Sequence, residues 1–311
     1  MPAPAGAGSI VGGPASSVAT VRSAASTVSH PDIVTTIAEL RTRLDTARAA
    51  GRTVAFVPTM GSLHEGHLSL VAHAAELSDQ VVVSVFVNPL QFGPTERFEQ
   101  YPRDLEADRA ALAQHPAAIV FAPASAEMYP TGPSQTRIAA GAVGTLFEGR
   151  SRPGHFDGML TIVAKLLNVV QPDVAVFGQK DAQQVFLVQR MVRELDIPSR
   201  IVISETVRAA DGLALSSRNA YLDEGQRRAA TSIPLALKAA QSAAGRGIDA
   251  VLSAAQGVLM GEPGIELYYF AVVDPATFRP VRAEFRGVAR TLIAARVGAT
   301  RLIDTETLVL G

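Results

Sequence analysis

Apolar residues in the first 206 positions follow two alternating patterns. Short runs rich in apolar residues predict buried strands at residues 53–57, 81–87, 118–121, 174–177 and 200–204. Apolar residues spaced three or four apart predict amphipathic helices at residues 37–47, 67–77, 104–114, 156–170 and 181–195. Strands of this kind, separated by helices, are typical of a parallel sheet covered on both faces. We therefore expect a Rossmann-like, doubly wound α/β domain over residues 32–206, with ligands bound beyond the carboxyl ends of its strands.

The pattern changes after about residue 206. Two helical stretches, at residues 224–245 and 248–260, precede three strands predicted at 265–273, 289–297 and 300–306. We expect residues 207–311 to form a smaller α+β domain that closes over the site. Residues 1–31 are rich in Ala, Ser, Gly and Pro, and Arg22 is the only charged side chain among them. This composition predicts a disordered tail.

Composition narrows the class of function. The chain has 28 Lys and Arg against 29 Asp and Glu, so its net charge of −1 favours neither nucleic acid nor an acidic membrane as a partner. Cysteine is absent, which excludes disulfides and thiolate nucleophiles and fits a reducing compartment. The apolar run at residues 81–87 is too short to cross a bilayer. We expect a cytoplasmic protein that acts on small molecules.

The first candidate site follows the strand predicted at residues 53–57. There the sequence reads Pro58-Thr59-Met60-Gly61-Ser62-Leu63-His64-Glu65-Gly66-His67. His64 and His67, at i and i+3, share one face of the first helical turn. A helix start favours anions and lowers the pKa of a histidine, so neutral imidazole donors to a phosphate are expected. A structural or metal-binding pair is the alternative, although zinc hydrolases need histidines at i and i+4.

Two further segments offer donors to a phosphate. Gly178-Gln179-Lys180-Asp181 follows the strand predicted at residues 174–177, and Lys180 is one of only three lysines in the chain. An ammonium 4 Å from a unit negative charge gains about 4 kcal/mol at an effective dielectric near 20. Within residues 211–219, Ser216, Ser217 and Arg218 place two hydroxyls beside a guanidinium. A surface turn and a capped helix start are the structural alternatives for these two segments.

Amides make a fourth group. Asn88 and Gln91 follow the strand at residues 81–87, while Gln183 and Gln184 lie on the helix at 181–195. An amide is both donor and acceptor, which suits a hydroxy acid. These amides converge only if the parallel sheet is correct. Otherwise they are ordinary solvated side chains.

Five segments in this order resemble the pantothenate synthetase family, which lies in the nucleotidyltransferase superfamily with a histidine–glycine–histidine signature. They are residues 58–67, 86–93, 152–158, 177–184 and 211–222. The resemblance covers residues 32–305. It implies a two-step reaction in which ATP and pantoate give pantoyl adenylate and pyrophosphate, and β-alanine then gives pantothenate, a coenzyme A precursor, and AMP. It also implies Mg²⁺ and a homodimer.

The resemblance also assigns residues. His67 matches the proton donor and His64 its partner, and Lys180, Ser216, Ser217 and Arg218 complete the catalytic group. Gln91 and Gln184 match the pantoate-binding glutamines, and Asp108 is the candidate Mg²⁺ ligand. The ATP-binding positions are Met60, Gly61, Ser62, Leu63, His64, Glu65, Gly66, His67, Gly178, Gln179, Lys180, Asp181, Val207, Leu215, Ser216, Ser217 and Arg218.

Two other functions are compatible with a phosphate site on a parallel sheet. One is a nucleotidyltransferase that leaves its nucleotide on the product. The other is an inactive nucleotide-binding regulator. The regulator predicts that the reactive side chains are replaced, yet all six catalytic candidates are present.

Overall fold

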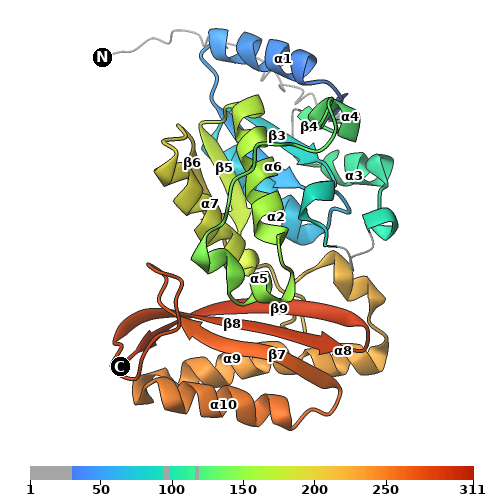
Figure 1. Cartoon of the computed structure of the whole chain (residues 1–311). Helices are drawn as coiled ribbons and strands as arrows, with labels where there is room; N and C mark the ends of the chain where they lie inside the picture. The colour runs from blue at the N-terminus through green and yellow to red at the C-terminus, as the bar shows by residue number, and fades with distance from the viewer. Residues whose placement is uncertain (1–29, 94–97, 116–118) are drawn as a thin grey trace, which may run out of the picture.

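The computed structural model describes residues 30–93, 98–115 and 119–311, and the chain forms two sheet-based layers (Figure 1). The tail predicted for residues 1–31 lies outside the described residues except for positions 30 and 31.

The larger sheet has six strands in the order β1-β4-β3-β2-β5-β6, and all its pairings are parallel. The strands are β1 (Asp32–Val34), β2 (Val54–Thr59), β3 (Gln80–Val85), β4 (Ile119–Phe121), β5 (Val174–Gly178) and β6 (Arg200–Ser204). From β2 the chain continues to β3 on one side, whereas β5 pairs with β2 on the other. This reversal creates a crevice at the carboxyl ends of β2 and β5, where ligands bind in open α/β sheets. The expected Rossmann-like fold is confirmed.

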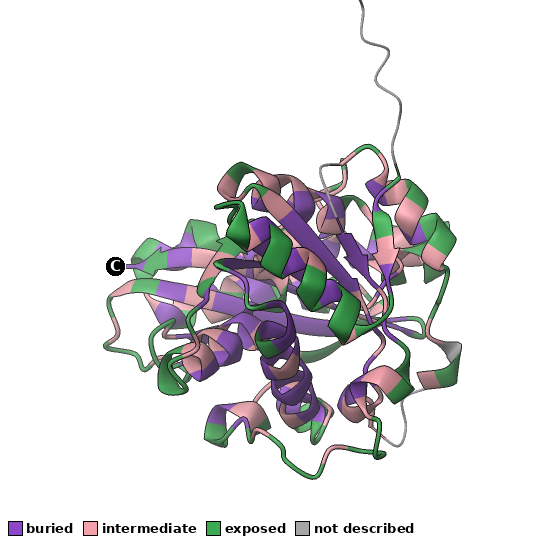
Figure 2. Ribbon diagram, turned by 90° about the horizontal axis from the view of Figure 1, so that it is seen from above, coloured by how far each residue is buried: buried purple, intermediate pink, exposed green. Residues whose placement is uncertain are grey.

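Helices cover both faces of this sheet. They are α1 (Ile37–Ala49), α2 (Glu65–Leu77), α3 (Leu105–Leu112), α4 (Ser125–Met128), α5 (Glu148–Ser151), α6 (His155–Val170) and α7 (Ala182–Glu194), and the five longest lie close to the bounds that periodicity predicts. Alternate side chains of β2 enter different cores: Val54 and Phe56 pack with α6, and Ala55 and Val57 pack with α2. In Figure 2 the strands are largely buried, and the covering helices turn exposed faces outward.

The smaller sheet is antiparallel and consists of β7 (Ile265–Val273), β8 (Gly287–Val297) and β9 (Thr300–Leu310). Strand β9 is longer than the predicted 300–306. Helices α9 (Ser232–Ala243) and α10 (Ile248–Met260) pack on one face of this sheet, and its other face is turned toward the larger sheet (Figure 1).

The helical stretch predicted at residues 224–245 is interrupted once. It is divided at Thr231 into α8 (Glu224–Ala230) and α9. Pro234 lies in the first turn of α9, where a proline is tolerated because its missing N–H needs no helical partner. That same missing N–H prevents α8 from continuing through this point. The described residues contain no helix long and apolar enough to span a membrane.

Candidate active site

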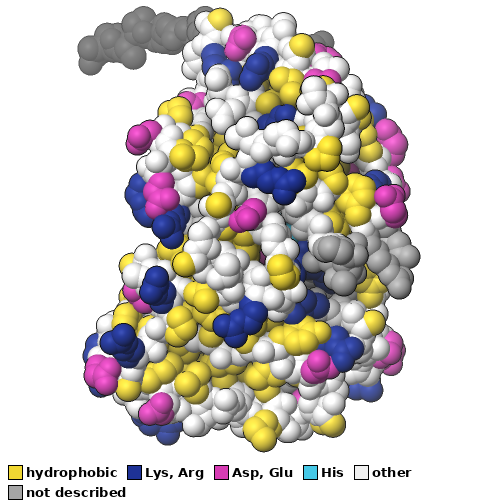
Figure 3. Space-filling model, in the orientation of Figure 1, with side chains coloured by type: hydrophobic (Ala, Val, Ile, Leu, Met, Phe, Trp, Pro, Cys, Tyr) yellow, Lys and Arg dark blue, Asp and Glu magenta, His cyan; other side chains and the backbone are white. Residues whose placement is uncertain are grey.

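A cleft of about 590 Å³ lies between the carboxyl ends of β2 and β5 and the smaller sheet. In Figure 3, Lys and Arg side chains are spread over the visible face, and several of them lie near the middle of the molecule, where the two layers meet. The cleft is lined by many of the predicted site residues, namely Met60, His64, His67, Gln91, Lys180, Asp181, Gln184, Ser216, Ser217 and Arg218. The structure therefore brings together the four separate segments that sequence reasoning identified.

The other predicted ATP-binding positions belong to the same segments but do not line the cleft. These are Gly61, Ser62, Leu63, Glu65, Gly66, Gly178, Gln179, Val207 and Leu215. Two of them hold their segment in place, since Val207 O accepts a hydrogen bond of 2.9 Å from Leu215 N. A Cβ at Gly178 would meet nothing closer than 3.9 Å, so close packing does not require glycine there.

The β2–α2 loop has a strained backbone that Asp108 stabilises. Gly61 has φ +81° and Ser62 has φ +54°, and a Cβ on Gly61 would lie 2.7 Å from Asp108 Oδ2. The Asp108 carboxylate, on α3, accepts hydrogen bonds from Ser62 N at 3.1 Å and from Leu63 N at 2.7 Å. Asp108 is buried, which raises its pKa, and it does not line the cleft. Its geometry indicates that it orders the loop, and its predicted role as a metal ligand stays a prediction.

The two histidines are adjacent, with ring centroids 4.1 Å apart. His64 is the N-cap of α2, and its Nδ1 accepts a 3.1 Å hydrogen bond from Gly66 N. Its proton must therefore be on Nε2. Burial, with the positive charge of Lys180, lowers the pKa of His64 to about 4. Burial, followed by His64 and Lys180, lowers the pKa of His67 to about 3. Both rings are neutral donors near pH 7, and among the described residues His67 Nδ1 has no hydrogen-bond partner.

Lys180 links two of the predicted phosphate-binding segments. It lies in the short helix η4 (Gln179–Asp181), and its Nζ donates to Leu215 O at 2.8 Å. Burial lowers its pKa. Residue 215 leads into η5 (Ser217–Tyr221), whose N-cap Ser216 accepts a 3.3 Å hydrogen bond from Arg218 N. The capped turn that was the structural alternative for this segment is therefore present. It holds Ser216, Ser217 and Arg218, which we call the donor strip, at the wall of the cleft, and their role toward phosphate stays a prediction.

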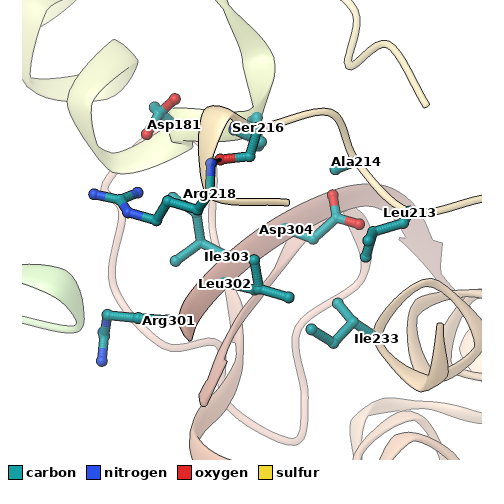
Figure 4. Close-up of a pocket in the computed structure, with 11 residues that line it drawn as sticks. Asp181, Leu213, Ala214, Ser216, Arg218, Ile233, Arg301, Leu302, Ile303 and Asp304 are labelled. Carbon is teal, nitrogen blue, oxygen red and sulfur yellow. Dashed lines mark hydrogen bonds between the residues drawn. The ribbon is translucent and has the colours of Figure 1, made fainter. Parts of the chain in front are cut away.

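Strand β9 lies beside this donor strip and contacts the segment that leads into it. Figure 4 shows Ser216 and Arg218 beside Asp304 and Arg301 of β9. Asp304 is 2% exposed and forms an ion pair with Arg208 at 2.6 Å. Because Arg208 precedes the donor strip, this ion pair fixes the strip to the smaller sheet.

The predicted amides divide into two groups. Gln91, in η1 (Pro89–Gln91), and both Gln183 and Gln184, on α7, line the cleft. Gln183 has a structural role, since its Nε2 donates to Val143 O at 2.8 Å and to Leu146 O at 2.9 Å. Its Oε1 accepts from Glu148 N at 3.1 Å. The Gln183 amide is thus held by the backbone of residues 143–148, and the substrate-binding role of Gln184 stays a prediction.

Sequence reasoning missed the residues that the smaller sheet contributes. Tyr269 donates a 2.9 Å hydrogen bond to Glu148 Oε1, and Arg301 forms an ion pair with the same carboxylate. The guanidinium of Arg301 also lies 4.4 Å from the ring centre of Tyr268. All four side chains line the cleft. Tyr269 and Arg301 lie 121 and 153 positions from Glu148 in the chain, and no local sequence pattern connects them.

A protein-family model described as pantoate–β-alanine ligase matches residues 32–307. The chain belongs to the pantoate–β-alanine ligase family. It is 57% identical over 287 residues to a pantothenate synthetase of Leifsonia xyli, which covers 89% of this chain and all of that protein. A pantothenate synthetase of Agrobacterium fabrum is 48% identical over 279 residues, covering 89% of this chain and 95% of that protein.

Solved structures of this ligase family agree with the fold. The pantothenate synthetase of Thermus thermophilus superposes with a TM-score of 0.83 at 46% identity, covering 88% of this chain and 98% of that one. The pantoate–β-alanine ligase of Francisella tularensis has a TM-score of 0.73 at 32% identity, covering 89% and 97% of the two chains. That structure is described as complexed with β,γ-ATP and β-alanine. The expected family and fold class are confirmed.

Proposed function

We propose that this ligase condenses pantoate with β-alanine to pantothenate, with cleavage of ATP to AMP and pyrophosphate. The observation that supports this most directly is that one cleft is lined both by donors to phosphate and by amides that suit a hydroxy acid. The histidine pair, Lys180 and Arg218 supply donors to phosphates, and Gln91 with Gln184 supplies amides for a hydroxy acid. The family match names the same acid and amine.

In the first step, a carboxylate oxygen of pantoate bonds to the α-phosphorus of ATP. The bond from the α-phosphorus to the oxygen that bridges to the β-phosphate breaks, and pyrophosphate leaves. The attacking and attacked groups are both anionic. Lys180 and Arg218 reduce their repulsion, and neutral His64 and His67 donate to oxygens on which negative charge develops.

In the second step, the neutral amine of β-alanine attacks the acyl carbon of pantoyl adenylate. The bond from that carbon to the AMP oxygen breaks, AMP leaves, and the nitrogen releases a proton to solvent. A free amine with a pKa near 10 is only about one part in a thousand neutral at pH 7. His64 and His67 are weak bases because burial lowers their pKa values to about 4 and about 3. We therefore assign this step mainly to the positioning of the amine against the acyl carbon.

We propose that Mg²⁺ enters with ATP. Among the described residues no group of three His, Cys, Asp or Glu side chains is arranged to hold a metal ion. This fits Mg²⁺, which keeps several waters and binds chiefly through substrate phosphates with one or two carboxylates. When bound, the ion neutralises phosphate charge. Asp108 is the carboxylate that the family resemblance assigns to it, although both of its oxygens already accept backbone hydrogen bonds.

Further proposals concern the whole chain. We place the domain boundary at residues 206 and 207, with residues 207–311 closing over the cleft when ATP binds. The contacts of β9 with Arg208, Ser216 and Arg218 support placing these residues in the same domain as the smaller sheet. We also propose a homodimer, which light scattering tests, and a cytoplasmic location, where ATP is available as the co-substrate.

Mass spectrometry tests the reaction. The purified chain is given ATP, Mg²⁺, pantoate and β-alanine, and we expect pantothenate and AMP in equal amounts. Pyrophosphate released without AMP or the amide would instead indicate a nucleotidyltransferase that leaves its nucleotide on the product. ATP binding without any turnover would indicate an inactive regulator.

A further inference from the structure

Gln91 is held from several sides before any substrate binds. Its backbone oxygen receives a 2.8 Å hydrogen bond from His155 Nδ1. A Cβ at Gly158, on α6, would lie 2.0 Å from Leu90 O, so the absence of a side chain there lets η1 pack directly against this helix. The 7% exposure of Gln91 agrees with a side chain that has little freedom.

Asn88 determines which end of the Gln91 amide faces the cleft. A backbone oxygen can only accept and a backbone N–H can only donate. Asn88 lies 3.1 Å from Gly158 O through one end of its amide and 3.3 Å from Leu90 N through the other. The first end must be Nδ2 and the second Oδ1, so this amide cannot be flipped.

The orientation of Asn88 passes to Gln91. Asn88 Nδ2 has a second hydrogen, which it donates to Gln91 Oε1 at 3.3 Å. With its oxygen occupied in this way, Gln91 directs Nε2 toward Met60 Sδ, 2.7 Å away at the wall of the cleft. A thioether is a weak acceptor. The amide N–H groups therefore stay available for an oxygen of the substrate.

Tyr129 completes the network from outside the cleft. Since Asn88 Oδ1 is an acceptor, the Tyr129 hydroxyl must donate to it, at 2.7 Å. Lys165 donates to the backbone oxygen of Met128 and lies 5.2 Å from the Tyr129 ring centre, which fixes the ring on α6. Burial raises the Tyr129 pKa to about 12, so its proton is present throughout the range in which enzymes work.

We propose that Tyr129 is a positioning residue for the acid substrate, acting through Asn88 to present the Gln91 amide nitrogen to a hydroxyl or carboxylate oxygen of that acid. The proposal rests on the proposed function, because it names a residue that supports the pantoate site. Tyr129 does not line the cleft, so it acts without touching the substrate.

A double-mutant cycle tests this relay. Tyr129→Phe keeps the ring and removes only the hydroxyl. We expect it to raise the KM for pantoate about three- to ten-fold, the effect of losing one hydrogen bond, with the KM for ATP unchanged. Gln91→Ala should raise the pantoate KM further, and Tyr129→Phe should add nothing in that background because the relay ends at Gln91.

Ser199→Ala is the matched control. It also removes one buried hydroxyl, which donates to Pro172 O at 2.7 Å, but it has no path to Gln91. Its pantoate KM should equal that of the wild type. An unchanged pantoate KM in Tyr129→Phe, or a full additional effect on top of Gln91→Ala, would overturn the relay while wild-type turnover still supports the proposed function. A wild-type chain that forms no pantothenate would overturn both.

Discussion

Lys180 lies where two of the phosphate-binding segments meet, because its Nζ donates to Leu215 O. We predict that Lys180→Ala lowers pantoate-dependent ATP–pyrophosphate exchange by about 10²- to 10³-fold, since a preorganised donor to developing charge is lost. Lys238→Ala, which removes an exposed lysine on α9, should leave the exchange unchanged. Exchange close to the wild-type rate in Lys180→Ala would refute the assignment.

The lowered pKa of His67 makes the stability of the fold depend on pH. In the unfolded chain this histidine binds a proton below about pH 6.5, whereas in the folded chain it stays neutral down to about pH 3. The unfolded state therefore binds more protons between these values, and the free energy of unfolding falls as the pH falls through this window.

We predict that His67→Gln removes this dependence. Relative to the variant, the wild type should lose about 1–2 kcal/mol of unfolding free energy between pH 7 and pH 5. Denaturant titrations at several pH values measure the difference. Parallel curves for the two proteins would show that His67 is not held neutral.

Sequence reasoning at the scale of residues identified types and positions but not partners. The histidine pair and Lys180 follow from strand ends and residue chemistry, whereas the family resemblance singled out Gln91 and Gln184 among the four amides. Residue chemistry alone did not separate Gln183 from Gln184, which only the family resemblance did, because the difference depends on which side chain meets the carbonyls of the 143–146 segment. The two backbone donors to Asp108 were likewise unpredictable, because they lie 45 and 46 positions away in the chain.

At the scale of elements, the β2–α2 loop depends on α3 for its shape. We predict that Asp108→Asn raises the KM for ATP several-fold, because an amide nitrogen would replace one of the two acceptors facing Ser62 N and Leu63 N. Raising the Mg²⁺ concentration should not restore the KM, since the loop itself has changed.

The Mg²⁺ titration separates this role from metal binding. If Asp108 were chiefly a metal ligand, excess Mg²⁺ would recover most of the lost affinity. Asp104→Asn is the control on the same helix. Asp104 is the N-cap of α3, where asparagine is an equally good cap, and the ATP KM should not change.

The long helices and strands could be predicted because each contains many apolar residues that fit the same helical or strand period. β1 was missed because three residues, Asp32–Val34, form too short a run to show a period, and only its pairing with β4 makes it a strand. The break between α8 and α9 was missed because helical periodicity continues across it. The strand order was not predicted at all, since it depends on long-range pairing.

At the scale of the whole molecule, one carboxylate connects the two sheet layers. Glu148 of α5 binds both Tyr269 of β7 and Arg301 of β9, and its side chain is only 13% exposed. We predict that Glu148→Gln lowers the midpoint of thermal unfolding by about 2–6 °C, because an ion pair partly shielded from water is lost.

The same variant should loosen the layers. In X-ray scattering without ATP, Glu148→Gln should have a larger radius of gyration than the wild type. Glu266→Gln is the control, because it breaks a solvent-exposed pair with Arg296 inside the smaller sheet and should change neither measurement. Equal radii for Glu148→Gln and the wild type would mean that other contacts hold the layers together.

The environment of Lys180 also affects how readily its amine reacts with acylating reagents. Of the three lysines, Lys238 lies on the surface, while the amino groups of Lys165 and Lys180 each donate to a backbone oxygen, at Met128 and at Leu215. Burial lowers the Lys180 pKa, so a larger fraction of its amine is uncharged and nucleophilic at a given pH. We therefore expect an acylating reagent small enough to enter the cleft to meet a less fully protonated amine at Lys180 than at an exposed lysine, and bound ATP to shield it.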